Sequence, residues 1–427
     1  MLKANIQKYR KSKNVVTIVN NFIWLSVLQV AGFVLPLLTM PYLARVIGAS
    51  GMGRVAFAAA IMLWVQTFVD WGFNYTATRD VAVNRENLER VSEIFSAVFW
   101  ARLFLMSIAL FILIFLTFFV PIFNENSEII FVTFLMIPGH ILFPEWLFQA
   151  LERMKYISIL NISSKLLFTI AVFIFIKDKN DYILQPLFIS LGFLLSGLIS
   201  LYYIHYKWKI KILTPSYTNI KDTLSEGSHL FINTLMPNLY NSFSVILLGI
   251  FSNSYMNGIY DAGKKLTTIA ANLLQIISRA CFPYLVRNPH KHHFFAKVVL
   301  IITTSIIFAI FIFAPQLISI FFGEGFTESI IVLRITSIAM LFVMLSNIYG
   351  ANFLIIIKKD RLLRNITITA SLIGFTISFP LIHKWNYIGA SFTYLISSAI
   401  LGTLIFYFAM KLKKNKTIIQ TSEKQGA

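Results

Sequence analysis

Runs of about twenty mainly apolar residues follow one another along almost the whole chain, separated by short polar segments. A helix needs about 20 such residues to cross the hydrocarbon core of a bilayer. The pattern therefore predicts an all-α integral membrane protein. Windows of this size place twelve transmembrane helices near residues 18–45, 54–76, 96–120, 129–151, 157–177, 183–206, 229–252, 258–286, 297–322, 329–357, 365–383 and 387–410.

Composition supports the membrane assignment. The chain has 427 residues, of which 57% are hydrophobic and 13% charged, a higher apolar share than soluble domains have. The longest polar stretch, 207–226, is too short to form a separate soluble domain. All polar segments are therefore expected to be loops, linkers or tails.

The distribution of Lys and Arg predicts the orientation. If the N-terminus is inside, most of the 37 Lys and Arg residues fall in cytoplasmic segments. The opposite side then holds only Arg45, Arg54, Lys177, Lys179 and Lys384. Because cytoplasmic loops are enriched in Lys and Arg, we expect both termini to be cytoplasmic. The net charge of +19 thus reflects topology, and no nucleic-acid partner is expected.

The sequence offers no catalytic chemistry. Cys281 is the only cysteine, which excludes an intramolecular disulfide or a cysteine-based metal cluster. Hydrolase triads, metalloprotease motifs and phosphate-binding loops are absent from the sequence. We therefore expect no catalytic residue, no metal and no cofactor, and a protein that is not an enzyme.

A weak internal repeat predicts the domain organisation. Residues 50–56 align with 255–261 at an offset of 205, which also brings Arg153 onto Lys358. Repeats with an even number of spans are related by an axis along the membrane normal. The expected domains are an N-terminal six-helix bundle (1–206), a cytoplasmic linker (207–228), a C-terminal six-helix bundle (229–410) and a basic cytoplasmic tail (411–427). Chance similarity between short loops is the alternative.

Prolines interrupt several of the predicted spans. A proline breaks the helical hydrogen-bond ladder and is tolerated where a helix bends or borders a cavity. Ordinary packing kinks explain such prolines equally well. The residues concerned are Pro36, Pro41, Pro138, Pro144, Pro237 and Pro283.

Cations inside the predicted spans are the candidate functional residues. A Lys or Arg at mid-membrane costs roughly 2.5–3.5 kcal/mol, so each needs a partner, a polar cavity or a ligand. In the first bundle, Arg102 and Lys165 can be neutralised by Asp70 and Glu145, or can bind an anionic ligand. The six cations that fall within predicted spans are Arg102, Lys165, Lys264, Lys265, Arg279 and Arg334.

The second bundle has too few carboxylates for its cations. Asp261 precedes Lys265 by four residues and can pair with it on one helix face. At least two cations remain, which predicts an anionic ligand such as a pyrophosphate or an acidic sugar. Arg279 is the first candidate for that contact.

Two segments resemble a known transporter family. Residues 70–82 read DWGFNYTATRDVA, similar to the G-F-x-x-T-A-T-R-x-I-A segment of Wzx-type O-antigen flippases. Residues 41–48, followed by the sequence GMG at 51–53, resemble the first loop of that family. The family lies in the polysaccharide-transport branch of the multidrug/oligosaccharidyl-lipid/polysaccharide exporter superfamily. With the twelve-span layout, the resemblance covers essentially the whole chain.

The resemblance implies a two-lobed bundle around a central cationic cavity that alternates between inward-open and outward-open states. Such a protein moves undecaprenyl-diphosphate-linked oligosaccharide from the cytoplasmic to the periplasmic leaflet of the bacterial inner membrane. Arg79 would then meet the diphosphate at the cytoplasmic mouth, or anchor the topology, and Asp70 and Glu145 become candidates for ion coupling. The implied partners are the lipid-linked oligosaccharide, membrane lipids and other polysaccharide-assembly membrane proteins.

Two other functions compete with this interpretation. A drug exporter of the same superfamily would share the fold but would prefer an acidic cavity for its cationic substrates. A membrane-embedded polysaccharide polymerase would carry a large periplasmic loop, whereas the predicted outer loops are short. The excess of cations over carboxylates within the spans favours the flippase.

Overall fold

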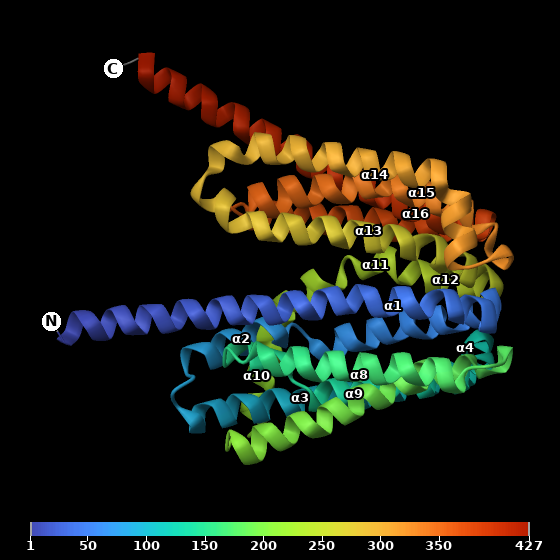
Figure 1. Ribbon diagram of the computed structural model, residues 1–427, viewed down its shortest axis with the longest axis horizontal. Helices are drawn as coiled ribbons and strands as arrows, with labels where there is room; N and C mark the ends of the chain where they lie inside the picture. Colours follow the sequence, from blue (N-terminus) through green and yellow to red (C-terminus); the bar gives the residue numbers. More distant parts are fainter. Residues whose placement is uncertain (1, 426–427) are drawn as a thin grey trace. The chain divides into compact units, whose positions relative to one another are not determined.

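The computed structural model describes residues 2–425, and the side chains of 20–413 except those at positions 22, 217 and 283. Every regular element in this part of the chain is helical (Figure 1). The protein is an all-helical membrane protein. Ten helical segments are long and apolar enough to cross a membrane: Ile23–Val83, Leu88–Phe119, Ser127–Ala150, Met154–Phe175, Lys179–Lys207, Thr218–Phe251, Ser254–Arg287, Pro289–Phe321, Ser329–Leu354 and Asp360–Lys413.

Two of these segments are much longer than one span needs, with 61 and 54 residues. In the first, helix α1 (Leu2–Asp70) contains a non-helical residue at Gly48, with φ of 65°. In the last, helix α16 (Asp360–Gln425) contains one at Asn386, with φ of 46°. Glycine and asparagine are the residues that tolerate positive φ. Spans that the sequence analysis separated by loops are therefore separated by single-residue breaks.

Prolines divide two spans that the sequence analysis drew as continuous. The expected span 129–151 consists of α5 (Ser127–Phe134), α6 (Met136–Leu142) and α7 (Glu145–Ala150), and Pro144 lies immediately before α7. The expected span 229–252 is divided at Pro237, between α10 (Tyr217–Leu235) and α11 (Asn238–Asn241). Because proline lacks an N–H and restricts the residue before it, a helix ends or bends at these positions.

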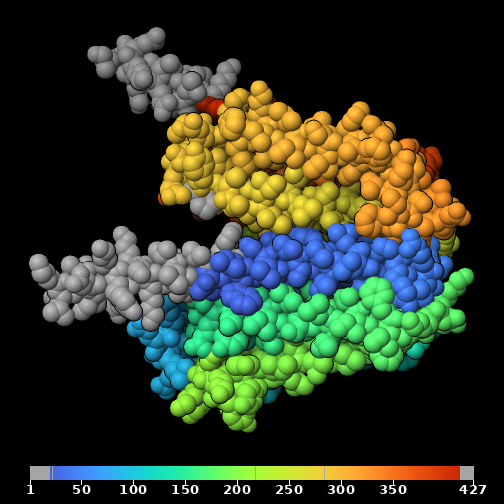
Figure 2. All heavy atoms as spheres, in the orientation of Figure 1, coloured from blue at the N-terminus to red at the C-terminus, as the bar shows by residue number. Residues whose placement is uncertain are grey.

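The chain forms two compact units. The first contains Met1–Ile47 and Ile61–Leu235. Its elements beyond α1, α5–α7 and α10 are α2 (Phe73–Val83), α3 (Leu88–Phe119), α4 (Pro121–Glu125), α8 (Met154–Phe175), the 3₁₀ turn η1 (Lys179–Ile183), α9 (Leu184–Tyr202) and the π segment η2 (Tyr203–Lys207). Figure 2 shows the part of α1 drawn in blue lying along the helices drawn in green.

The second unit contains Gly48–Ala60 and Met236–Ala427. Of the expected basic tail, 411–427, the side chains from 414 onward lie outside the described residues. Besides α11 and α16, the second unit contains α12 (Phe243–Phe251), α13 (Ser254–Arg287), η3 (Pro289–Lys291), α14 (His292–Phe321), η4 (Glu324–Phe326), α15 (Ser329–Leu345) and the π segment η5 (Ser346–Leu354).

The stretch expected as a cytoplasmic linker, 207–228, is helical from Tyr217 onward and forms the first part of α10. This helix packs against α2 and α3 within the first unit. Trp71, in the break between α1 and α2, stacks on Phe231 with ring centroids 4.2 Å apart and donates its indole N–H to the carbonyl of Leu224 at 2.8 Å. A Cβ on Gly72 would lie 2.8 Å from the backbone oxygen of Gly227. Only glycine permits this close approach.

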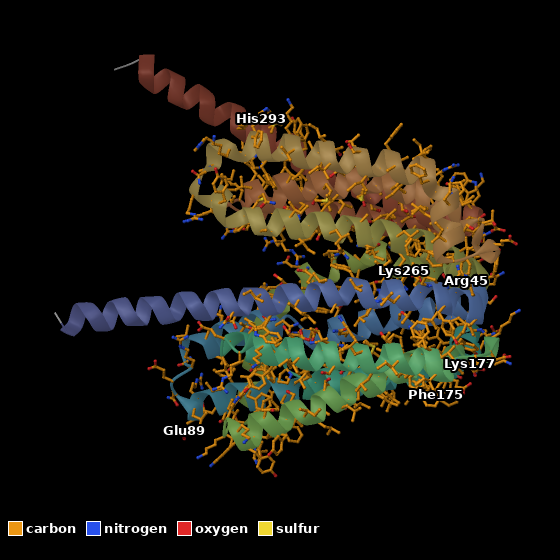
Figure 3. The ribbon with its side chains drawn as sticks, viewed as in Figure 1. Arg45, Glu89, Phe175, Lys177, Lys265 and His293 are labelled. Atoms are coloured by element: carbon orange, nitrogen blue, oxygen red, sulfur yellow. The ribbon has the colours of Figure 1, made fainter. Side chains whose placement is uncertain are left out.

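Helices α1 and α8 of the first unit run side by side in the same direction (Figure 1). Near one end, the Ser158 hydroxyl donates to the carbonyl of Trp24 at 2.7 Å. Near the other, the Tyr42 hydroxyl donates to the carbonyl of Ile176 at 2.6 Å. Arg45 and Lys177 lie at that second end, and Glu89 lies at the opposite end of the unit (Figure 3).

The two segments aligned by the offset of 205 pack directly against each other within the second unit. A Cβ on Gly53 would overlap the backbone oxygen of Ser254, and a Cβ on Gly258 would overlap that of Ala49. Ala49 and Ser254 are themselves related by the same offset, as are the two glycines. The contact is therefore reciprocal, as at an interface that obeys a two-fold axis.

Candidate functional site

Asp70, Asn74 and Arg102 meet at the break between α1 and α2. The Arg102 Nη2 lies 2.9 Å from Asp70 Oδ1 and donates to Asn74 Oδ1 at 2.9 Å. The Asn74 amide also donates to Asp70 Oδ2 at 3.3 Å. The side chain of Arg102 is 4% exposed and that of Asp70 is 25% exposed. Arg102 is therefore neutralised within the protein, which favours the ion-pair alternative over direct contact with a ligand.

Glu145 and Lys165, the other expected pair of the first unit, are not in direct contact. Glu145 Oε1 accepts a hydrogen bond of 2.8 Å from the amide of Asn161, which lies on α8 one turn before Lys165. Lys165 interacts electrostatically with Glu145, yet has no carboxylate within 4.0 Å among the described side chains. Glu145 also interacts electrostatically with Asp70 and Arg102. The four charged residues thus belong to one polar network, in which Arg102 and Asp70 form an ion pair and neither Glu145 nor Lys165 has an oppositely charged side chain within 4.0 Å among the described side chains.

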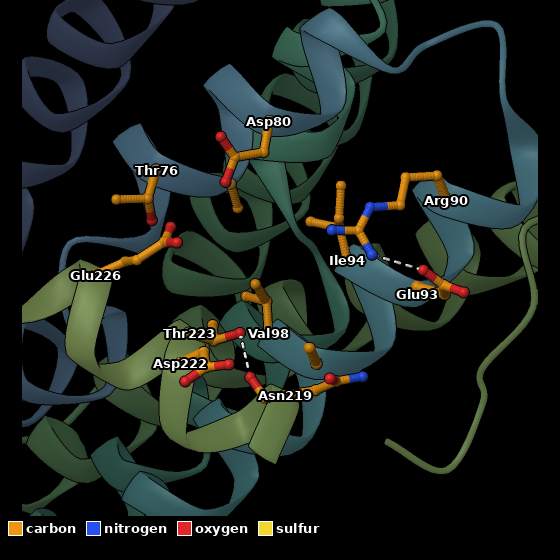
Figure 4. A pocket seen from close by; sticks show the side chains of 12 residues that line it. Thr76, Asp80, Arg90, Glu93, Ile94, Val98, Asn219, Asp222, Thr223 and Glu226 are labelled. Carbon is orange, nitrogen blue, oxygen red and sulfur yellow. Dashed lines mark hydrogen bonds and ion pairs between the residues drawn. The ribbon is translucent and has the colours of Figure 1, made fainter. Parts of the chain in front are cut away.

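Arg79 lies in acidic surroundings. Its side chain is 66% exposed and forms ion pairs with Asp80 at 2.8 Å and with Glu226 at 3.7 Å. A neighbouring pocket of about 210 Å³ between α2, α3 and α10 is lined by Asp80, Glu93, Asp222 and Glu226 (Figure 4). The pocket's own cation, Arg90, is bound to Glu93 at 2.7 Å. Acidic neighbours disfavour an approaching diphosphate, and the two roles expected for Arg79, contact with the diphosphate and anchoring of the topology, stay predictions.

The adjacent lysines of α13 have different environments. Lys265 pairs with Asp261 at 3.5 Å, as their four-residue spacing predicted. The Lys264 Nζ donates to the carbonyl of Asn241 at 3.2 Å and lies 4.6 Å from the ring centroid of Tyr394 and 5.3 Å from that of Tyr260. Aromatic faces attract a cation without neutralising it. Lys264 has these aromatic contacts but no carboxylate within 4.0 Å among the described side chains.

The two arginines expected at the site lie on different helices of the second unit. Arg334 on α15 donates from Nε to the carbonyl of Phe311 at 3.3 Å, with its guanidinium carbon 5.2 Å from the ring centroid of Phe311. Arg279 on α13 is exposed. Neither has a carboxylate within 4.0 Å in the part of the chain whose side chains are described.

A buried polar cluster beside Arg279 escaped the sequence analysis. Ser278 on α13 contacts the side-chain oxygen of Asn347, and the amide of Asn352 donates to the Ser278 hydroxyl at 2.5 Å. Both asparagines lie in the π segment η5. The signal available in the sequence was two asparagines within an otherwise apolar span. Because polar side chains in a span need partners, they could have been included among the candidates.

The described part of the chain brings no three His, Cys, Asp or Glu residues together as a metal site. What it assembles instead is a set of cations within apolar helices. Lys165 lies in the first unit, and Lys264, Arg279 and Arg334 lie in the second. None of the four has a carboxylate within 4.0 Å among the described side chains, whereas Arg102 and Lys265 are paired. Within each unit, a cation without a nearby carboxylate attracts negatively charged groups.

Comparisons with known proteins find relatives over most of the chain. Residues 18–289 match the family described as polysaccharide biosynthesis protein. A protein of Escherichia coli (strain K12) named "Putative O-antigen transporter" is 31% identical over 414 residues, which are 95% of this chain and 99% of that protein.

Two solved structures share the fold. The lipid II flippase MurJ in an inward closed conformation superposes with a TM-score of 0.70 at 12% identity, covering 90% of this chain and 87% of MurJ. An inward-facing multidrug resistance MATE family transporter of the MOP superfamily superposes with a TM-score of 0.65 at 15% identity, covering 93% of this chain and 99% of that transporter. At such identities the likeness concerns the fold alone.

Proposed function

The chain belongs to the polysaccharide biosynthesis protein family, and from that premise we propose that it is a flippase for undecaprenyl-diphosphate-linked oligosaccharide. It moves a surface-polysaccharide repeat unit, such as that of O-antigen, from the cytoplasmic to the periplasmic leaflet of the bacterial inner membrane. The E. coli relative is named for O-antigen transport, and one protein with this fold is named a lipid II flippase. These names support transport rather than catalysis.

The observation that carries the proposal is the set of unneutralised cations. Lys165, Lys264, Arg279 and Arg334 have no carboxylate within 4.0 Å among the described side chains, although they lie in helices apolar enough to span a membrane. Placing such charges within a membrane is costly unless a ligand or another polar partner compensates them. A diphosphate compensates several cations in turn as it moves. A cationic drug gains nothing from them, which disfavours the drug-exporter alternative.

In this proposal the chain spans the membrane twelve times. The segments of 61 and 54 residues each supply two spans, because each is longer than two membrane crossings require and is broken at Gly48 or Asn386. The bundles at 1–206 and 229–410 act as equivalent repeats in alternating access. The reciprocal contact of Gly53 and Gly258 supports that equivalence.

The topology can be tested with reporter fusions. Fusions at Asn126 and Gly323 should report a periplasmic location, and fusions at Asn219 and Gln425 a cytoplasmic one. The expectation rests on the concentration of Lys and Arg in the loops assigned to the cytoplasm. Paired alkaline phosphatase and fluorescent protein fusions give opposite signals at each site. A single reversed site would remove the twelve-span arrangement.

Replacing Arg279 tests the role of the cations in transport. Arg279→Ala should slow surface-glycan assembly in a flippase-null strain about tenfold, as expected for loss of one charge-assisted contact. Arg279→Lys should keep part of the activity because it keeps the charge. The measurement compares glycan assembly with the amount of protein in the membrane.

The matched control is Lys291→Ala, which removes an exposed cation of the loop after α13. It should leave both quantities unchanged. Full assembly by Arg279→Ala at normal abundance would exclude Arg279 from the transport path. Export of a cationic dye without glycan assembly by the unmodified protein would instead favour the drug exporter.

A further inference from the structure

A second cavity lies inside the first unit, between α1, α8 and α9, with a volume of about 170 Å³. Its walls are mostly apolar and include Leu35 and Pro36 of α1, Phe168 of α8, and Ile189 and Phe193 of α9. Polar side chains are confined to α8. They are Asn161, Ser164, Lys165 and Thr169. The cavity therefore combines mostly apolar walls with one cationic side chain, Lys165.

The ammonium of Lys165 has room at this cavity because α1 carries a glycine opposite to it. A Cβ on Gly32 would lie 3.3 Å from Lys165 Nζ. Pro36, one turn further along α1, has no N–H to donate to the carbonyl of Gly32. On the α1 side of the cavity, Gly32 thus leaves space for the ammonium, and its carbonyl oxygen lacks the usual helical N–H donor.

Thr169 provides an independent sign that the cavity accommodates a ligand. Its side chain is 9% exposed, lines the cavity, and its hydroxyl has no hydrogen-bond partner. A threonine within a helix commonly donates to a carbonyl of the preceding turn, as Thr133 does to Ile129. Buried polar atoms without partners are rare and call for an explanation.

The size of the cavity restricts what can enter. An apolar cavity of about 150 Å³ admits a molecule of the size of benzene. A volume of about 170 Å³ therefore fits one isoprene unit of a hydrocarbon chain and is too small for a sugar repeat unit. An isoprenoid next to an anionic group would match both the apolar walls and Lys165.

The order of residues along α8 gives the ligand a direction. Asn161 and Lys165 precede Phe168 and Thr169, and α8 begins at the end of the unit where Ser158 contacts Trp24. With a cytoplasmic N-terminus, the polar end of the cavity faces the cytoplasm and its apolar part lies deeper in the membrane. A lipid in the cytoplasmic leaflet has the same orientation, with its head towards the cytoplasm and its chain inward.

We propose that this cavity, defined by Gly32, Pro36, Lys165 and Thr169, binds the first isoprene unit of a polyprenyl phosphate, with the phosphate at Lys165. The inference rests on the proposed flippase function and deepens it. It separates recognition of the lipid chain from recognition of the glycan. Charge complementarity at Lys165 selects a phosphate-bearing isoprenoid rather than a neutral acyl chain.

The test measures lipid binding to the purified full-length protein by native mass spectrometry. The probes are undecaprenyl phosphate, undecaprenol and phosphatidylglycerol. Undecaprenyl phosphate should bind about tenfold more tightly than undecaprenol, because only the phosphate engages Lys165. Lys165→Gln removes the charge, keeps a polar side chain and should bring the two affinities close together.

Filling the cavity should weaken binding of both isoprenoids. Thr169→Phe should lower their affinity about tenfold by excluding the first isoprene unit from its apolar site. The matched control is Ile170→Phe, which enlarges the adjacent residue of α8, 55% exposed, and should change nothing. Thermal unfolding checks that each variant is folded. If Thr169→Phe does not fold, the result with Lys165→Gln still tests the site.

Three outcomes would overturn the site. The first is unchanged isoprenoid binding by folded Thr169→Phe, and the second is an unchanged preference for the phosphate in Lys165→Gln. The third is binding of phosphatidylglycerol as tight as that of undecaprenyl phosphate, which would make the cavity a general anionic-lipid site. Glycan assembly in the flippase-null strain reports the proposed function separately. If the unmodified protein restores assembly but fails the binding test, the site is wrong and the function stands. If it binds as expected but restores nothing, the function is wrong and the site stands.

Discussion

Gly53→Val is expected to reduce the amount of folded protein in the membrane about tenfold or more. A valine side chain at this position would occupy the place of the Ser254 backbone oxygen, and neither backbone can move without displacing its helix. Overpacking commonly costs about 1–3 kcal/mol, and a clash with backbone belongs at the upper end or beyond. Gly258→Val should behave alike, because its Cβ meets the backbone oxygen of Ala49. Membrane abundance and thermal unfolding in detergent measure the effect.

Gly325→Val is the matched control, because no atom lies within 4 Å of a Cβ at Gly325. It should be tolerated. The double variant Gly53→Val with Gly258→Val should be hardly less stable than either single variant, since both valines disrupt the same contact. Normal abundance and stability of Gly53→Val would show that the two segments do not pack as described.

Removing Arg102 is expected to destabilise the protein by about 3–5 kcal/mol, the usual cost of leaving one member of a buried ion pair alone. Arg102→Met leaves the carboxylate of Asp70 without its cation and Asn74 without its donor. Asp70→Asn leaves the guanidinium of Arg102, whose side chain is 4% exposed, without its counter-charge. Each variant should have a lower midpoint of thermal unfolding and a lower abundance in the membrane.

The double variant Asp70→Asn with Arg102→Met separates a structural from a functional role. It removes both charges and should recover much of the lost stability. Arg90→Met, which breaks the exposed pair with Glu93, serves as the control and should cost less than about 1 kcal/mol. If Arg102→Met were stable yet unable to assemble glycan, Arg102 would be a ligand contact and the ion-pair assignment would be wrong.

Much of the architecture could be predicted from the sequence, because the length of an apolar run is set by the bilayer. The all-helical membrane class and the family are confirmed. The helix interruptions were only partly foreseen. Pro144 and Pro237 gave a signal, whereas the breaks at Trp71 and Asn386 depend on positive φ values that the sequence pattern does not reveal.

The partners of the charged residues were harder to predict. Asp261 and Lys265 are close in sequence, so helical spacing was sufficient to pair them. Arg102 and Asp70 lie on separate helices, and their pairing depends on how each helix is rotated. Tyr394, beside Lys264, and Glu226, beside Arg79, come from distant segments. Periodicity along one helix does not contain that information.

The packing of α10 against the Trp71–Gly72 break has a consequence for biosynthesis. Trp71 and Gly72 leave the ribosome long before Gly227 and Phe231, which complete their contacts. The first half of the chain therefore cannot finish folding when its last long apolar helix, α9, has been inserted. It must wait, partly assembled in the bilayer, until α10 has been translated, and a nascent chain stopped before Tyr217 would remain exposed to quality-control proteases.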